Sequence, residues 1–130
     1  MTMRTTRLLL CVIACSSITA LATPSVSTSL LTPAQFKAKM AVGQAVLINV
    51  HVPDEGALPN TKLRLPFDTI ASNPSLPRNK SALILLYCRS GHMSAIANKS
   101  LKQLGYTQIY ELKGGFEAWK AAGYALAPGR

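Results

Sequence analysis

The feature that most constrains the fold is an unbroken apolar run over residues 82–87 that ends at Cys88. Because its apolar residues do not alternate with polar ones, the run predicts a strand covered on both faces, as in a parallel sheet. A short polar loop, residues 89–92, follows, and apolar residues then recur at helical spacing over residues 93–104. A buried strand that passes through a short loop into a helix indicates an α/β fold, with this strand at its centre.

The flanking sequence contains the remaining elements of one modest domain. Thr32, Pro33 and Gln35 offer an N-cap, a proline at the first helical position and a capping-box partner for a helix to about Met40. Further patterns predict strands over residues 46–52 and 108–113, a short edge piece over 63–66 and a helix over 116–122. This order predicts a central parallel sheet flanked by helices. A length of 130 residues suffices for one such domain, expected over residues 31–127.

The first 22 residues have the pattern of a secretory signal peptide. Arg4 and Arg7 precede an apolar stretch, and the small-residue site Ala20-Leu21-Ala22 follows it. We expect cleavage after Ala22, a flexible tether over residues 23–30 and a periplasmic or secreted protein. Alternatively, residues 12–15 resemble a lipoprotein processing site. Acylation of Cys15 would then attach the protein to a membrane.

Removal of residues 1–22 leaves a basic chain with one thiol. From residue 23 onward there are 12 Lys and Arg against five Asp and Glu, a net charge of +7. The basic residues are scattered singly and no aromatic RNA-binding motif accompanies them, which argues against nucleic acid as a partner. Cys88 is the only cysteine of this part, so the mature chain has no disulfide framework.

Cys88 occupies the place where α/β proteins bind ligands, at the carboxyl end of a strand and before a helix N-terminus. The amides of a tight loop and of a helix N-terminus stabilise a thiolate and hold an anion beside it. On position alone, a buried structural cysteine fits equally well. The candidate site comprises Cys88 as nucleophile, with Arg89, Ser90, Gly91, His92, Met93 and Ser94 as substrate-binding residues.

Their expected roles follow from their chemistry. Gly91 gives the loop its curvature, Ser90 and Ser94 can donate hydrogen bonds to sulfur, and Arg89 and His92 can attract an anion. Elsewhere, the spacing of His and Cys residues is not that of a metal site. Asp54 and Glu55 lie on a loop without a paired base and are interpreted as solvated turn residues. His51 is interpreted as a structural histidine.

Four segments, in order, resemble the successive signatures of a single-domain rhodanese-like protein. They are residues 47–51 (Leu-Ile-Asn-Val-His), 87–94 (Tyr-Cys-Arg-Ser-Gly-His-Met-Ser), 104–106 (Leu-Gly-Tyr) and 112–119 (Leu-Lys-Gly-Gly-Phe-Glu-Ala-Trp). The resemblance implies a sulfurtransferase in which Cys88 takes the sulfane sulfur of a small anionic donor such as thiosulfate. The persulfide then passes its sulfur to a thiol, cyanide or protein acceptor. No metal or organic cofactor is implied, and exported members resembling phage-shock rhodaneses fit a periplasmic location.

The chain departs from the family pattern at three places. The family's usual Asp-Val-Arg at the end of the first core strand is Asn49-Val50-His51 here, so a structural carboxylate and guanidinium are missing together. The usual Gly-His-Ile-Pro-Gly-Ala segment is replaced by residues 56–61. The active-site loop carries His92 and Met93 where an arginine or threonine is frequent. These departures concern substrate preference more than fold.

Three other functions compete with sulfur transfer. Related phosphatase and arsenate-reductase loops have the form Cys-x5-Arg, but Ser94 stands six places after Cys88, so the guanidinium that clamps an oxyanion is lacking. A non-catalytic rhodanese-like binding module is an alternative, although such modules usually lack the cysteine. A thiol redox protein is another, because an accessible thiolate is readily oxidised.

Overall fold

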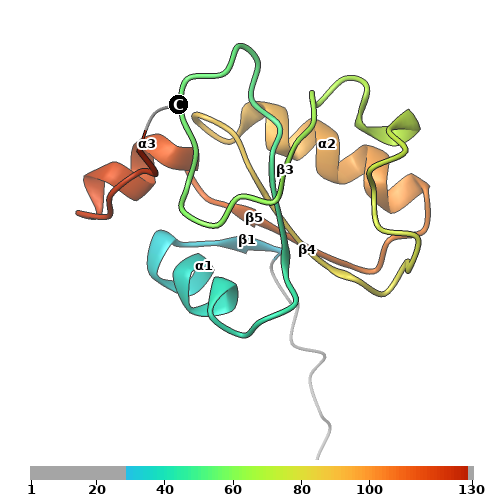
Figure 1. Ribbon diagram of the computed structural model, residues 1–130, viewed down its shortest axis with the longest axis horizontal. Coiled ribbons are helices and arrows are strands. Elements are labelled where there is room, and N and C mark those ends of the chain that lie inside the picture. The colour runs from blue at the N-terminus through green and yellow to red at the C-terminus, as the bar shows by residue number, and fades with distance from the viewer. Residues whose placement is uncertain (1–28, 129–130) are drawn as a thin grey trace, which may run out of the picture.

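The computed structural model describes residues 29–128, which form a five-stranded parallel sheet with helices on both faces (Figure 1). The strands are β1 (Leu30–Leu31), β2 (Val46–Asn49), β3 (Leu63–Arg64), β4 (Leu83–Tyr87) and β5 (Gln108–Leu112). The helices are α1 (Pro33–Met40), η1 (Ile70–Ser72), α2 (His92–Gln103) and α3 (Gly115–Ala121). The predicted α/β class and the parallel sheet flanked by helices are confirmed.

The strand before Cys88 is the middle strand of the sheet. The order is β1-β5-β4-β2-β3, and β4 pairs in parallel with β2 on one side and β5 on the other. Ile84, Leu85 and Leu86 are fully buried. Their side chains alternate between the two faces of the sheet, so both faces must be covered, as the unbroken apolar run predicts.

Two hydrophobic layers lie on opposite faces of the sheet. One is built with α2 and η1, and its buried residues include Ile48, Val50, Ile70, Ile84, Leu86, Cys88, Ala97, Leu101 and Ile109. The other is built with α1 and α3, and its buried residues include Phe36, Leu47, Leu85, Tyr87, Leu112, Phe116 and Trp119. Figure 1 shows α2 on one side of the sheet and α1 and α3 on the other.

The predicted start of α1 is confirmed in detail. The Thr32 hydroxyl accepts a hydrogen bond from the Gln35 backbone N–H at 3.3 Å. The Gln35 side-chain oxygen accepts one from the Thr32 N–H at 3.0 Å. With Pro33 at the first helical position, this reciprocal capping box fixes where the chain enters the helix.

Two boundaries differ from the sequence prediction. The tether predicted over residues 23–30 extends too far, because Leu30 belongs to β1 and the Glu111 N–H donates to the Ser29 carbonyl at 2.7 Å. A two-residue strand is too short to carry a periodic signal. The strand predicted over residues 46–52 ends at Asn49, and the His51 N–H donates to the Asn49 side-chain oxygen at 2.9 Å rather than to a neighbouring strand.

The predicted signal peptide and lipidation site lie outside the described residues, as does the tether up to residue 28. Within residues 29–128, no helix has the length and apolarity needed to cross a membrane.

Tyr87 ties the central strand to the segment that follows β2. Its hydroxyl accepts from the Leu58 N–H at 3.0 Å and lies 2.7 Å from the Thr61 hydroxyl. The Thr61 hydroxyl itself donates to the Leu58 carbonyl at 2.8 Å, so the phenol donates its own proton to Thr61. Burial raises the pKa of Tyr87 above its ordinary value of 10.0, and the hydrogen bond from the Leu58 N–H opposes this only in part.

We expect Tyr87→Phe to change how stability depends on alkaline pH. The folded protein holds the phenol proton more tightly than the unfolded chain, so this stabilisation is full below about pH 10 and is lost as pH rises through the folded pKa. At pH 7 the variant should lose about 1–2 kcal/mol, because the buried Leu58 N–H loses its acceptor. Between pH 9 and 11 its stability should fall less steeply than that of the wild type. Urea unfolding across this range measures both effects, and equal slopes would contradict the prediction.

Candidate active site

Cys88 lies between the end of β4 and the start of α2, where one loop amide points at its sulfur. The Gly91 N–H donates to Cys88 Sγ at 3.0 Å, and the Ser94 hydroxyl lies 3.8 Å from the same sulfur. Ser94 is buried and donates to the Gly91 carbonyl at 3.0 Å, which holds the loop closed over the thiol. Gly91 has a φ of 108°, a conformation that favours glycine. The loop therefore offers the sulfur a backbone donor at the N-terminus of a helix.

The cysteine loop is supported from α3. The Phe116 N–H donates to the Cys88 carbonyl at 2.9 Å, and the Glu117 N–H donates to the Arg89 carbonyl at 3.1 Å. Gly115 permits this approach, because a Cβ atom there would lie 2.4 Å from the Cys88 carbonyl oxygen. The glycine turn before α3 thus positions the loop as well as ending β5.

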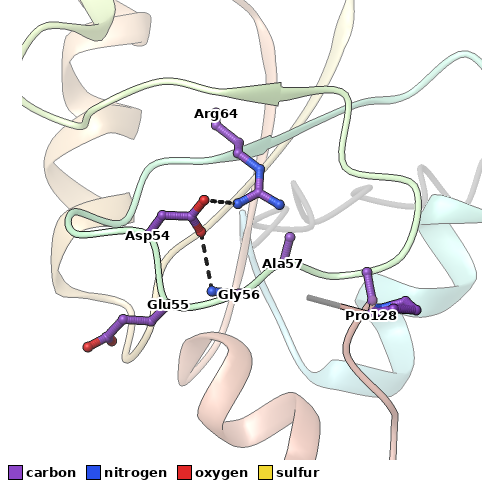
Figure 2. A pocket seen from close by; sticks show the side chains of 7 residues that line it. Asp54, Glu55, Gly56, Ala57, Arg64 and Pro128 are labelled. Carbon is purple, nitrogen blue, oxygen red and sulfur yellow. Dashed lines mark hydrogen bonds and ion pairs between the residues drawn. The ribbon is translucent and has the colours of Figure 1, made fainter. Parts of the chain in front are cut away.

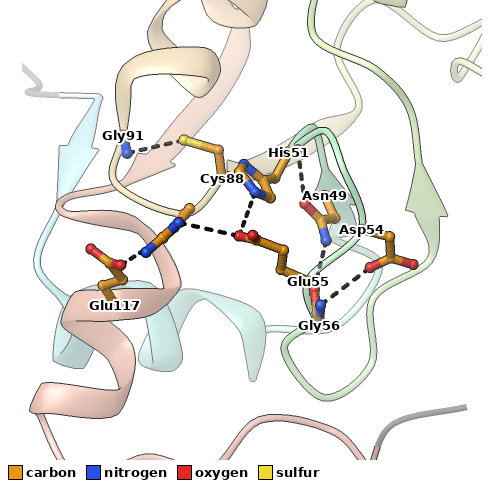
Figure 3. A network of polar contacts seen from close by, with 9 residues as sticks. Asn49, His51, Asp54, Glu55, Gly56, Cys88, Gly91 and Glu117 are labelled. Carbon is orange, nitrogen blue, oxygen red and sulfur yellow. Dashed lines mark hydrogen bonds and ion pairs between the residues drawn. The ribbon is translucent and has the colours of Figure 1, made fainter.

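Arg89 contacts two carboxylates from distant parts of the chain, those of Glu55 and Glu117, both labelled in Figure 3. Its Nε donates to Glu117 Oε1 at 2.7 Å, and its Nη1 lies 3.6 Å from Glu55 Oε2. The hydrogen bond and charge of Glu117, followed by the charge of Glu55, raise the pKa of the Arg89 guanidinium above its ordinary value. The Arg89 charge is therefore compensated within the protein.

Asn49 and His51, at and just after the end of β2, form a separate set of polar contacts. The Asn49 amide donates to the Gly56 carbonyl at 2.9 Å and accepts from the His51 N–H. His51 Nε2 lies 2.9 Å from Glu55 Oε2, and its ring packs edge-on against Phe116, with 5.6 Å between ring centroids. Asn49 and His51 thus anchor the segment that carries Glu55 toward Arg89.

The residues named from the sequence occupy different environments. Cys88, Gly91 and Ser94 come together around the sulfur, Met93 packs against the α2-side core, and Ser90 and His92 are exposed. Sequence reasoning missed the contacts of the two glutamates. Glu55 was interpreted as a solvated turn residue, but it contacts both His51 and Arg89. Its position four residues after His51 was the one available signal.

A cavity of about 300 Å³ opens beside this network (Figure 2). It is lined by Asp54, Glu55, Gly56, Ala57, Arg64, Ala127 and Pro128. Asp54 forms an ion pair with Arg64 and accepts from the Gly56 N–H at 3.2 Å, so its charged groups already satisfy one another. In the described part of the chain, no group of three or more His, Cys, Asp or Glu side chains could hold a metal ion.

The fold and the site together define a class: a parallel α/β protein with a candidate cysteine nucleophile at the carboxyl end of its central strand. The sequence profile of the Rhodanese-like domain matches residues 32–122. The chain therefore belongs to the rhodanese-like family, as its sequence signatures predict.

Individual relatives agree with this assignment. The chain is 34% identical over 85 residues to a sulfurtransferase from Allochromatium vinosum, covering 62% of this chain and 77% of that one. A rhodanese-like domain protein from Staphylococcus aureus has a similar structure, with a TM-score of 0.63, 28% identity and coverage of 78% and 98%. A protein of unknown function from Rhodopseudomonas palustris, described as a possible tyrosine phosphatase, has a TM-score of 0.64, 25% identity and coverage of 78% and 86%. The family match and the sulfurtransferase relative support a sulfurtransferase-type or rhodanese-domain function, while the two solved structures support the fold.

Proposed function

We propose that the protein transfers sulfane sulfur through a persulfide on Cys88. The observation that carries this proposal is the Gly91 N–H directed at Cys88 Sγ at 3.0 Å, at the N-terminus of α2. Amide donors at a helix N-terminus favour a thiolate over a thiol, and a thiolate is the nucleophile that the chemistry requires. The family match and the sulfurtransferase relative support the same chemistry.

The reaction has two displacement steps at sulfur. The Cys88 thiolate attacks the outer sulfur of thiosulfate or a similar donor, a new S–S bond forms, and the old S–S bond breaks. Its electron pair leaves with sulfite, and Cys88 keeps the sulfur as a persulfide anion. A thiolate of a small molecule or protein, or cyanide, then attacks the outer sulfur and regenerates the Cys88 thiolate.

The loop supplies what a persulfide needs. N–H groups in the first turn of a helix have no acceptor within the helix, so those at the start of α2 are available to the outer sulfur. Ser94 lies 3.8 Å from Cys88 Sγ and can turn its hydroxyl toward a bound sulfur. In this proposal the exposed side chains of Ser90 and His92 line the path by which a donor reaches Cys88, and Met93 fixes the loop to the core.

We expect mass spectrometry of the exported protein to detect the intermediate. After exposure to thiosulfate, the intact mass should rise by about 32 Da in the wild type and not in Cys88→Ala, since the adduct is covalent. A chain that begins at Thr23 would support our proposal of export by signal peptide, whereas an acylated Cys15 would support the lipoprotein alternative.

Three measurements on the wild type and Cys88→Ala separate sulfur transfer from its competitors. No adduct with any sulfane donor would refute the proposal. A binding module would retain its partner equally in wild type and Cys88→Ala. A redox role would instead give a gain of oxygen under mild peroxide, which a sulfenate-selective reagent traps.

A further inference from the structure

Arg89 is poorly placed to recruit a free dianion. Its guanidinium contacts Glu117 at 2.7 Å and Glu55 at 3.6 Å, so two carboxylates face one cation. Glu117 belongs to α3 and Glu55 to the loop after β2, and each is fixed by further contacts. The Glu117 N–H binds the Arg89 carbonyl, and Glu55 binds His51. These contacts hold the guanidinium on the carboxylates.

The ion-paired groups around Arg89 and Arg64 have a net charge opposite in sign to that of the whole chain. Asp54, Glu55 and Glu117, here called the acidic rim, are three of the five carboxylate side chains of the whole sequence. Together with Arg64 and Arg89, these three carboxylates have a net charge of −1 when His51 is neutral. The rest of the chain from residue 23 onward has ten Lys and Arg against two carboxylates. At physiological salt, charges act over about 8 Å, so the two carboxylates that contact Arg89 act on its guanidinium more strongly than distant basic residues do.

Building on the proposed sulfur transfer, we propose that Glu55 and Glu117 determine donor specificity. By holding and neutralising Arg89 they favour sulfane donors with one negative charge, such as persulfides and thiosulfonates, over the thiosulfate dianion. Glu55 and Glu117 act through Arg89 and through the local charge, and neither touches the sulfur that is transferred.

Two donors that react in the same way but differ in charge can show the effect of donor charge alone. Thiosulfate carries two negative charges and methanethiosulfonate one, and in both the Cys88 thiolate attacks the outer sulfur. The new S–S bond forms as the old one breaks, and the electron pair leaves with sulfite or with methanesulfinate. Intrinsic reactivity cancels when the ratio of kcat/KM for the two donors is compared between variants.

We expect Glu117→Gln to raise the thiosulfate-to-methanethiosulfonate ratio of kcat/KM about three- to tenfold, mainly by lowering KM for thiosulfate. Glu55→Gln should change the ratio in the same direction. Asp68→Asn removes the same charge from an exposed residue that forms no ion pair within residues 29–128, and it should leave the ratio within about twofold of wild type. Added salt should reduce thiosulfate turnover more steeply in Glu117→Gln than in wild type.

Arg89→Gln tests whether the guanidinium released in Glu117→Gln causes the rise in the donor ratio. In the wild-type background it should lower the thiosulfate-to-methanethiosulfonate ratio, because it leaves Glu55 and Glu117 without the cation they share and makes the site more negative. In the Glu117→Gln background it should remove most of the gain, as a double-mutant cycle would show. A gain that persists without Arg89 would contradict the proposed route.

The outcomes for specificity and for function are distinct. An unchanged donor ratio in both glutamine variants, with both donors still loading Cys88, would overturn the specificity proposal and leave sulfur transfer standing. Failure of both donors to load the wild-type protein would refute the proposed function itself.

Discussion

Cys88→Ser is expected to lower sulfur-transfer turnover by at least about 10³-fold while the protein stays folded. A serine hydroxyl is a poor nucleophile at neutral pH and cannot form a persulfide. The side chain is 1% exposed, and the Gly91 N–H that now binds sulfur can donate to the serine oxygen instead. Stability should therefore change by only about 1 kcal/mol, as for a buried hydroxyl that keeps a partner.

Two measurements make this result decisive. Turnover is followed as sulfite released from thiosulfate in the presence of cyanide, and stability by urea unfolding of the same preparation. Loss of turnover with an unchanged unfolding midpoint places the defect in the chemistry. Turnover above about a hundredth of the wild-type value in a folded Cys88→Ser protein would mean that another group carries the sulfur.

The long elements could be predicted because their patterns are local. The apolar run that became β4 and the helical periodicity that became α2 each span a whole element, and the capping box that starts α1 lies within four residues. The position of Cys88 at the carboxyl end of the central strand follows directly from these elements. A short strand such as β1 depends on backbone hydrogen bonds to β5, which leave no mark on its own sequence.

The polar surroundings of the cysteine could not be predicted in the same way. The contact of Arg89 with Glu55 joins residues 34 positions apart, and that with Glu117 joins residues 28 apart. No spacing rule connects such residues, since their proximity depends on how α3 and the loop after β2 pack around the loop that follows β4. The chemistry of Arg89 alone predicts that it attracts an anion, whereas in the structure its charge pairs with two carboxylates.

Gly115→Ala is expected to be the most destabilising single substitution near the site, costing about 3–5 kcal/mol. Gly115 has a φ of 62°, which costs an alanine about 1–2 kcal/mol. The added Cβ would also lie 2.3 Å from the Arg89 carbonyl oxygen and 2.4 Å from that of Cys88. These are backbone atoms that cannot rotate away, so α3 and the cysteine loop would have to separate.

Gly105→Ala is the matched control for this substitution. Gly105 has a φ of 94° but no neighbour within 4 Å of its added Cβ, so it tests the backbone strain alone and should cost about 1–2 kcal/mol. Urea unfolding of both variants gives the difference, and loss of a cooperative transition in Gly115→Ala would agree with the larger cost. If the two variants are equally stable, the loop does not depend on the close approach of α3. If Gly115→Ala alone loses sulfur transfer under conditions where it remains folded, the backbone hydrogen bonds from Phe116 and Glu117 position the reactive loop as well as stabilising it.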